Sequence, residues 1–169
     1  MESTAPIQNL QSEICNLQSA ICNLQYNHLM VVFRTKRRIE FGDTDMAGIV
    51  HFANFFRFME SAECKFLRSR GLSVTMDWEG QAIGFPRVSA SCDYVSPARF
   101  EDVLEVAVSI ARVGAKSVTY AFEFTRGNAL IARGKVTSCC VRVGPHHQIQ
   151  GIAIPASYRA LLQSDTTSA

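Results

Sequence analysis

Two aspartates, Asp43 and Asp45, flank a threonine just before an apolar, glycine-containing loop in the stretch FGDTDMAGIVHFANFF. A core excludes unpaired charges, and a plain surface turn has no need of the apolar residues that follow. The loop from Gly48 to Phe52 leads into a predicted helix, whose first turn offers unpaired backbone N–H groups and the positive end of the helix dipole. A carboxylate beside such donors suits acyl transfer, because it can serve as nucleophile or base while the donors polarise a carbonyl.

The patterns on both sides of this loop predict the elements that hold it. Residues 30–41 alternate apolar and basic residues, as a half-buried strand does. After the loop, apolar residues recur every three or four positions and predict a helix over about 54–70, ending before Gly71. Further stretches alternate with period two and predict strands over 85–96, 103–114, 116–127 and 129–143. A short helix over about 155–162 is expected to close the domain.

These elements predict an α+β architecture in which one antiparallel sheet wraps around one long central helix. A single curled sheet of this kind leaves its other face and an edge uncovered. Dimerisation is a natural way to cover them, so we expect a homodimer or homotetramer.

The N-terminal segment, residues 1–29, differs from the rest of the chain. It repeats NLQSEIC and NLQSAIC, so that isoleucines and leucines fall at a and d positions of a heptad. A coiled coil usually needs roughly three or four heptads, which favours an appended segment over an oligomerisation helix, although both interpretations stay open. We therefore predict an N-terminal extension over 1–29, a domain over 30–163 and a flexible tail over 164–169.

Composition restricts the classes of function. The chain has 169 residues, and 17 basic against 15 acidic residues give a net charge of +2. No field strong enough to imply a nucleic-acid partner follows from this balance. No apolar stretch approaches the roughly 20 residues of a membrane span, and the six cysteines lack Cys-x-x-Cys spacing and a secretory context. We expect reduced thiols in a soluble, cytoplasmic protein that does not bind membranes.

The stretch RRIEFGDTDMAGIVHFANFFRFMESAE resembles the hotdog-fold acyl-CoA thioesterases of the 4-hydroxybenzoyl-CoA thioesterase type. Its pattern Asp-x-Asp-x-x-Gly-[Ile/Val]-Val, followed by an aromatic-rich helix, is specific for that family. The resemblance extends from about Phe33 to about Leu162 and includes FPRVSASCDYVSPARFEDVLEV and ARVGAKSVTY. It implies the hotdog fold, with the sheet wrapped around the helix.

Carried over by position, the resemblance implies that Asp45 is the catalytic carboxylate and that the backbone N–H of Phe52 polarises the thioester carbonyl. Asp43 is similar to a supporting acid, which we expect to cap loop N–H groups. Some relatives have a histidine where this chain has Phe52, whereas His51 comes one residue earlier. We therefore favour a loop or interface histidine over a catalytic one at His51.

Further residues are candidates for substrate binding. Lys116 and Ser117 match positions at which relatives approach the nucleotide part of CoA. Glu60 is equally consistent with an exposed helix face and with a contact to a polar group of the acyl moiety, whereas for Glu63 a solvated or interface face is favoured. Two adjacent histidines, 146 and 147, have no carboxylate or cysteine partners in sequence, so we expect no metal site.

The predicted function is hydrolysis of an acyl-CoA thioester, with an aryl or hydroxyaryl acyl group permitted by the aromatic-rich helix. No cofactor is expected, since CoA is part of the substrate. The carboxylate could attack the carbonyl or activate water, and the sequence leaves both routes open. Two alternatives remain: a non-catalytic hotdog module that binds acyl-CoA, against which the intact Asp45 argues, and a hotdog hydratase or dehydratase.

Overall fold

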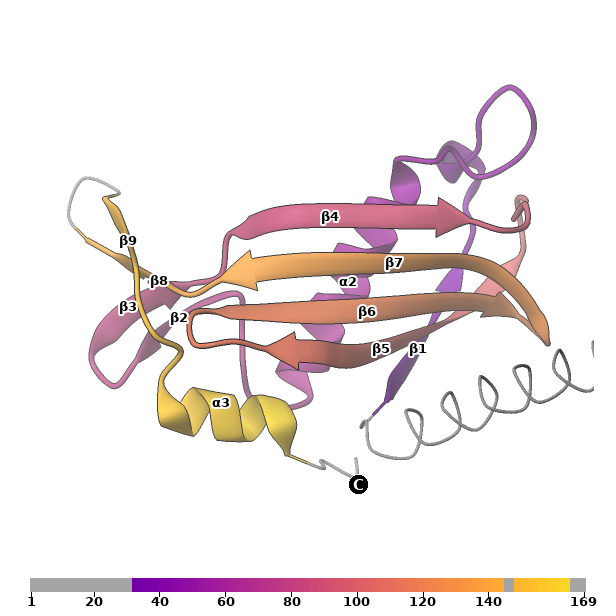
Figure 1. The fold of residues 1–169 in the computed structure, drawn as a ribbon. Helices are drawn as coiled ribbons and strands as arrows, with labels where there is room; N and C mark the ends of the chain where they lie inside the picture. Colours follow the sequence, from indigo (N-terminus) through magenta and orange to yellow (C-terminus); the bar gives the residue numbers. More distant parts are fainter. Residues whose placement is uncertain (1–31, 145–147, 165–169) are drawn as a thin grey trace, which may run out of the picture. The chain divides into compact units, whose positions relative to one another are not determined.

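The computed structural model describes residues 32–144 and 148–164. Figure 1 shows the elements, which in chain order are β1 (Phe33–Arg38), η1 (Phe41–Asp43, a 3-10 turn), α2 (Asn54–Arg68), β2 (Thr75–Trp78), β3 (Gln81–Gly84), β4 (Arg87–Tyr94), β5 (Val103–Val113), β6 (Ser117–Arg126), β7 (Ala129–Cys139), β8 (Val141–Val143), β9 (Ile149–Gly151) and α3 (Ala156–Gln163). The predicted extension over 1–29, and the tail beyond Ser164, lie outside the described residues, so the domain boundaries stay predictions.

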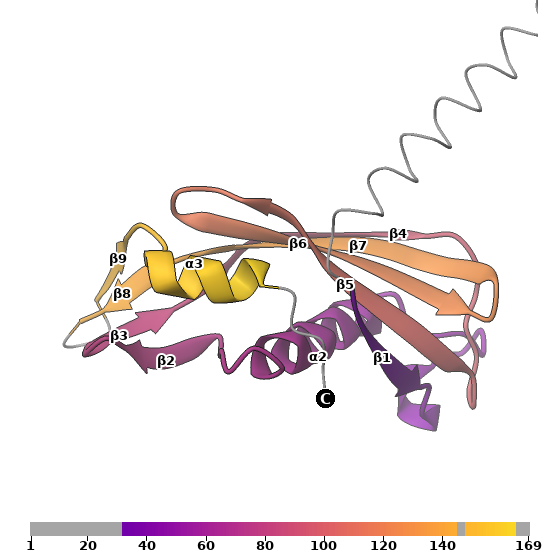
Figure 2. The same ribbon diagram turned by 90° about the horizontal axis from the view of Figure 1, so that it is seen from below.

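The main sheet has five antiparallel strands in the order β1-β5-β6-β7-β4. α2 lies along one face of this sheet, as the view from below in Figure 2 shows. Its apolar stripe is buried against the inward-facing residues of the central strands. The core members on α2 are Phe55, Phe58, Met59, Ala62, Phe66 and Leu67. This arrangement confirms the predicted hotdog fold. Apolar residues recur every 3.6 positions along α2 and every second position along the strands, so that the apolar faces of helix and sheet lie opposite each other.

A second, four-stranded sheet, in the order β2-β3-β8-β9, was not predicted. The stretch 129–143, expected to be one strand, divides into β7 and β8 at Cys140. Cys140 and Val141 are both buried although they are adjacent, and successive residues of one regular strand face opposite sides. The chain therefore changes sheets at this point, and the expectation of a single sheet was wrong.

The hairpin of β2 and β3 supplies the start of this second sheet. Trp78 pairs with Gln81 across a two-residue turn, Glu79–Gly80, in which both residues have positive φ, 52° and 76°. Such a turn matches the twist of the flanking strands, and glycine favours it. α3 covers the junction of the two sheets, where Tyr158 stacks on Phe85 at a ring distance of 4.8 Å.

The two edges of the main sheet are β1 and β4. β4 pairs with β7 on one side only, and most of its residues are exposed, including Val88 and Tyr94. An edge strand of this length presents a row of unpaired backbone groups. α2 runs antiparallel to β4, because the start of α2 lies at the Tyr94 end of the strand.

Candidate active site

The loop that carries Asp45 is a small closed turn. Thr44 and Val50 form an antiparallel bridge, and the Asp45 N–H donates to the Ile49 carbonyl at 2.9 Å. Gly48 closes the turn with a φ of 71°, a conformation that side chains rarely adopt, and donates its N–H to the Asp45 carbonyl. The Asp45 carboxylate is exposed, and its Oδ1 accepts the Ala47 N–H at 2.9 Å. The turn therefore holds the carboxylate in one orientation while Oδ2 has no partner among the described residues.

The start of α2 lies after this turn. His51 Nδ1 accepts the Ala53 N–H at 3.3 Å, and the His51 carbonyl accepts the Asn54 N–H at 2.9 Å. The imidazole also lies against the Phe52 ring, with 4.5 Å between centroids. The His51 side chain therefore bonds within the turn that precedes α2, and its role stays a prediction. Within the described residues the Phe52 N–H itself has no acceptor.

Asp45 and Phe52 meet at a pocket of ≈ 550 Å³. The remaining lining is largely apolar and comes from the Asp45 turn, the first turn of α2, and the end of β4 with the segment that follows it: Ile49, Val50, Phe55, Tyr94, Val95, Ser96, Pro97 and Ala98. The two residues predicted to do the chemistry thus line one cavity, together with a largely apolar wall. Such pockets, with few convergent polar groups, are typical of small-molecule sites.

Tyr94 is a site residue that the sequence did not indicate. Its hydroxyl donates to the Phe52 carbonyl at 3.0 Å, and its ring contacts Phe55 with 5.3 Å between centroids. Burial raises the pKa of Tyr94 further above its ordinary value of 10.0, so the hydroxyl remains a donor at neutral pH. Tyr94 therefore joins β4 to the start of α2. In sequence it stands at the end of a strand, where no motif distinguishes it.

Asp43 lies behind the loop and is only 8% exposed. Its Oδ2 accepts the Arg37 Nη2 donor at 2.7 Å and the Glu40 N–H at 2.9 Å. Its carbonyl accepts the His51 N–H and the Asn54 Nδ2 donor, both at 2.9 Å. Asp43 does cap a loop N–H, as expected, but the ion pair with Arg37 was not foreseen.

Glu60 is separated from the Asp45 pocket. It lines a second pocket of ≈ 220 Å³ with Glu63 and Arg87, between α2 and β4. Glu63 is completely buried, and its Oε2 accepts Arg87 Nη2 at 3.0 Å, while Glu60 lies 3.6 Å from the same nitrogen. Burial raises the pKa of Glu63, although Arg87 opposes this shift. The expectation of a solvated or interface face at Glu63 was therefore wrong, because the side chain is buried within the chain against Arg87. The amphipathic pattern cannot distinguish a paired buried glutamate from an exposed one.

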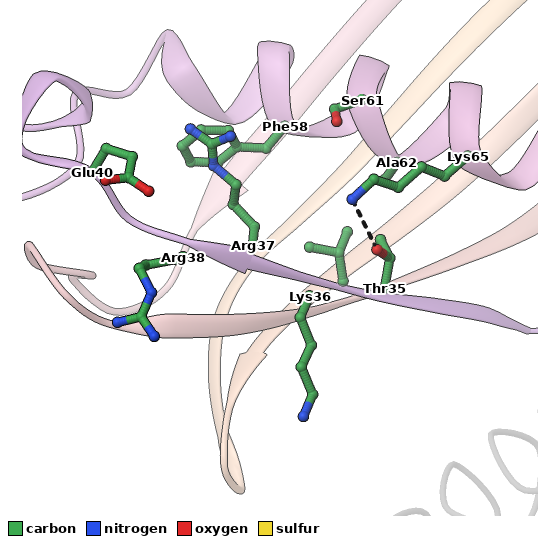
Figure 3. A pocket seen from close by; sticks show the side chains of 10 residues that line it. Thr35, Lys36, Arg37, Arg38, Glu40, Phe58, Ser61, Ala62 and Lys65 are labelled. Atoms are coloured by element: carbon green, nitrogen blue, oxygen red, sulfur yellow. Dashed lines mark hydrogen bonds between the residues drawn. The ribbon is translucent and has the colours of Figure 1, made fainter.

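A third pocket, of ≈ 180 Å³, lies on the opposite side of α2, next to β1. Figure 3 shows its residues: Thr35 and Arg37 point from β1 toward α2, whereas Lys36 and Arg38 point to the other face of the strand. Lys65 on α2 donates to Thr35 Oγ1 at 3.2 Å. Two of its lining residues, Arg37 and Glu40, donate hydrogen bonds to Asp43, which precedes the Asp45 turn.

No group of three metal-ligating side chains occurs in the described parts of the chain, 32–144 and 148–164. His146 and His147 lie outside these ranges. Over the same ranges, no helix has both the length and the apolar character needed to cross a bilayer.

The chain matches a family model described as the thioesterase-like superfamily over residues 39–162. It belongs to this superfamily. A putative esterase from Aquifex aeolicus is 30% identical over 112 residues, which are 66% of this chain and 87% of the relative. A 4-hydroxybenzoyl-CoA thioesterase from Pseudomonas sp. is 28% identical over 129 residues, covering 73% of this chain and 92% of the relative. The crystal structure of a 1,4-dihydroxy-2-naphthoyl-CoA thioesterase from Synechocystis matches with a TM-score of 0.66 at 25% identity, covering 78% and 95% of the two chains.

Membership in the thioesterase-like superfamily confirms the family resemblance and the predicted thioester hydrolase. It also agrees with the fold, since the match begins at Ile39, just before the Asp45 loop, and ends at Leu162 in α3. The assignment of roles to single residues stays a prediction.

Lys116 and Ser117 lie at the other end of this thioesterase-like domain. Lys116 Nζ donates to the Gly151 carbonyl at 3.3 Å, beside β9, and Ser117 pairs with Cys139 at the end of β7. Figure 1 shows this end of β6 far from the start of α2. β4 runs between the two ends and is about 23 Å long at roughly 3.3 Å per residue. Within one chain, these residues do not share a site with Asp45.

Proposed function

We propose that this chain hydrolyses acyl-CoA thioesters, with an aryl or hydroxyaryl acyl group, in the pocket between Asp45 and Phe52. One observation carries the proposal: Asp45, whose carboxylate has an oxygen without a partner among the described residues, and Phe52, whose backbone N–H lacks an acceptor among them, line the same largely apolar cavity just before α2. Thioester hydrolysis needs a group that attacks or activates water and a donor for the carbonyl oxygen.

The thioester carbonyl would lie with its oxygen at the Phe52 N–H, where the dipole of α2 adds a partial positive charge. As negative charge develops on this oxygen, the donor stabilises the transition state by about 3 kcal/mol if it resembles other oxyanion-hole donors. The Tyr94 hydroxyl, bound to the Phe52 carbonyl, fixes the orientation of this residue. Hence the polarising group is in place before the substrate arrives.

The Asp45 carboxylate would act on the carbonyl carbon by one of two routes. In the first it attacks directly, forms a mixed anhydride and releases the CoA thiolate, and water then cleaves the anhydride. In the second it removes a proton from the attacking water. Both routes need the charged carboxylate, and water is the only second reactant.

An aryl acyl group fits the apolar wall of the pocket, where Phe55, Tyr94 and Pro97 offer flat surfaces. The chain is similar to relatives named for aryl-CoA substrates, the 4-hydroxybenzoyl-CoA and 1,4-dihydroxy-2-naphthoyl-CoA thioesterases. These names support an aromatic acyl class for this chain.

We infer further that the active form is at least a dimer, joined along the exposed β4 edge. Antiparallel pairing of two β4 strands would continue the sheet and reverse the direction of the second copy. The Lys116 end of that copy would then lie on the same side as the Asp45 pocket of the first. In this way Lys116 and Ser117 could bind the nucleotide part of a CoA whose thioester lies at Asp45.

Replacement of Asp45 by Asn tests the proposal. Asn keeps the size and the bond to the Ala47 N–H, but removes the charge that both routes require. We expect turnover in a free-thiol assay to fall by at least about 10²-fold, the lower limit for general-base assistance, while substrate still binds. Asp77→Asn is the matched control, because Asp77 accepts the Gly80 N–H at 3.1 Å in a turn of its own and lies outside the pocket.

A panel of hydroxybenzoyl, hydroxynaphthoyl and fatty acyl thioesters of CoA identifies the acyl class. Single-turnover hydrolysis in ¹⁸O-labelled water separates the two routes. Direct attack transfers an unlabelled Asp45 oxygen to the first product and leaves the label in the enzyme, whereas general-base catalysis labels the product at once. Near-normal turnover of folded Asp45→Asn would refute the catalytic assignment. Absorbance changes at a double bond without thiol release would favour a hydratase instead.

A further inference from the structure

Arg37 occupies an unusual place for a charged residue, on the inner face of β1. Figure 3 shows its side chain turned toward α2, where the guanidinium lies 4.6 Å from the centre of the Phe58 ring. Its Nη2 donates to Asp43 Oδ2, and its Nε is buried without an acceptor among the described residues. Neighbouring basic residues of β1 differ, since Arg34 and Arg38 form exposed pairs with Glu105 and Glu101.

Asp43 connects Arg37 to both halves of the proposed site. The carboxylate side of Asp43 is held by Arg37 and by the Glu40 N–H. The carbonyl of Asp43 accepts the His51 N–H and the Asn54 side-chain amide, at the start of α2. Asp43 therefore stands between β1 and α2 and fixes the spacing of the chain between them.

Both reactive groups are within two residues of these bonds. Asp45 follows Asp43 by two positions, at the start of the closed turn. Phe52 directly follows His51, whose N–H binds the Asp43 carbonyl. A shift of Asp43 would consequently move the carboxylate and the N–H donor relative to each other. A displacement of about 1 Å at a reacting group can cost about 10²-fold in rate.

We propose that Arg37 is a positioning residue for this site: through its ion pair with Asp43 it holds the Asp45 carboxylate and the Phe52 N–H in register, without touching the substrate. The assignment of what is positioned rests on the proposed function. Arg37 lines the pocket next to β1 and does not line the Asp45 pocket, so a direct contact with the acyl group is not part of its role.

The test compares Arg37→Met, Arg37→Lys and the control Arg34→Met. Met keeps an apolar stem against Phe58 but removes the charge, and Arg34→Met removes an exposed pair of the same strand. We expect Arg37→Met to lower turnover by about 10²-fold with little change in the Michaelis constant, since the substrate contacts are intact. Arg37→Lys should recover most of the turnover, and Arg34→Met should behave as wild type.

Two further measurements separate positioning from other roles. Arg37→Met should speed hydrogen exchange of the His51 amide, which donates to Asp43. Asp43→Asn in the Arg37→Met background should lose no more turnover than the worse single variant, because both act through one ion pair. Losses that multiply, or a raised Michaelis constant with normal turnover, would overturn the proposal.

The outcomes also keep this proposal apart from the proposed function. If the wild-type protein hydrolyses no thioester, the function fails, and exchange at His51 still tests whether Arg37 orders the loop. If Arg37→Met does not fold, the Arg37→Lys variant decides the question. Turnover and hydrogen exchange of the His51 amide equal to those of wild type would support a requirement for positive charge at this position. Turnover as low as that of the Asp45→Asn variant would overturn the proposal. Equal exchange and turnover in Arg37→Met and Arg34→Met would also refute the positioning role.

Discussion

Gly134→Ala should destabilise the protein, because Gly134 of β7 lies against Met59 of α2. A Cβ at this position of β7 would overlap Met59 Sδ and would lie 3.2 Å from Met59 Cε and 3.3 Å from the Ser91 carbonyl oxygen. Met59 is completely buried, so any movement of its flexible end must be accommodated by the core side chains around it. The added methyl group must therefore displace α2 or strain the side chain.

The size of the effect follows from two opposing terms. Overpacking of a tight core costs about 1 to 3 kcal/mol. Alanine in a strand is preferred over glycine by about 0.5 to 1 kcal/mol, because glycine loses more backbone freedom on folding. Together the two ranges give a fall in the free energy of unfolding of about 0 to 2.5 kcal/mol, centred on about 1 kcal/mol. Since α2 carries the Phe52 N–H at its start, turnover should fall as well.

Denaturant unfolding at fixed protein concentration measures the change, with the single tryptophan, Trp78, and the far-UV signal as independent probes. Gly151→Ala in β9 is the control, because no atom lies within 4 Å of its added Cβ. Met59→Ala should cost less in the Gly134→Ala background than in the wild type, by about 0.5 to 3 kcal/mol of coupling. A gain in stability of Gly134→Ala, or additive effects of the two changes, would refute the close contact.

Three other predictions concern separate parts of the chain. Lys116→Ala should raise the Michaelis constant for acyl-CoA more than it lowers turnover, because a phosphate contact remote from the carbonyl is the same in ground and transition states. Hydrolysis of a pantetheine thioester, which lacks the nucleotide, should be insensitive to this change. Equal losses on both substrates would make Lys116 structural. Deletion of residues 1–29 should leave folding and hydrolysis intact, whereas loss of the oligomer would show a working coiled coil. Burial raises the pKa of Glu63 above 4.5 in the folded protein, so its stabilising contribution is full below that pH and is lost as the pH rises through the raised pKa. The stability of wild type relative to Glu63→Gln should therefore fall with rising pH, and a constant difference between about pH 4 and about pH 8 would contradict the shift.

The candidate site was predictable where local sequence determines geometry. The Asp45 turn depends on Gly48, whose positive φ closes it, and the Phe52 N–H lies in the short turn just before α2, where it has no acceptor among the described residues. Both features are read from a short stretch of the chain. Tyr94 was not foreseen, because it bonds to Phe52 from β4, a strand distant in sequence. Arg37 was not foreseen, because it acts on the loop only through its ion pair with Asp43.

By itself the sequence determined the elements with strong periodicity, α2 and the strands of the main sheet, since the period of the apolar residues depends only on the backbone of each element. Only the tertiary structure decided that Cys140 switches the chain to a second sheet, that Glu63 is buried against Arg87, and that Lys116 lies at the opposite end of the domain from Asp45. Each of these depends on which elements become neighbours. Packing between distant segments determines which group pairs with a buried charge. It also determines at which end of a sheet a turn lies, and no local sequence pattern predicts either.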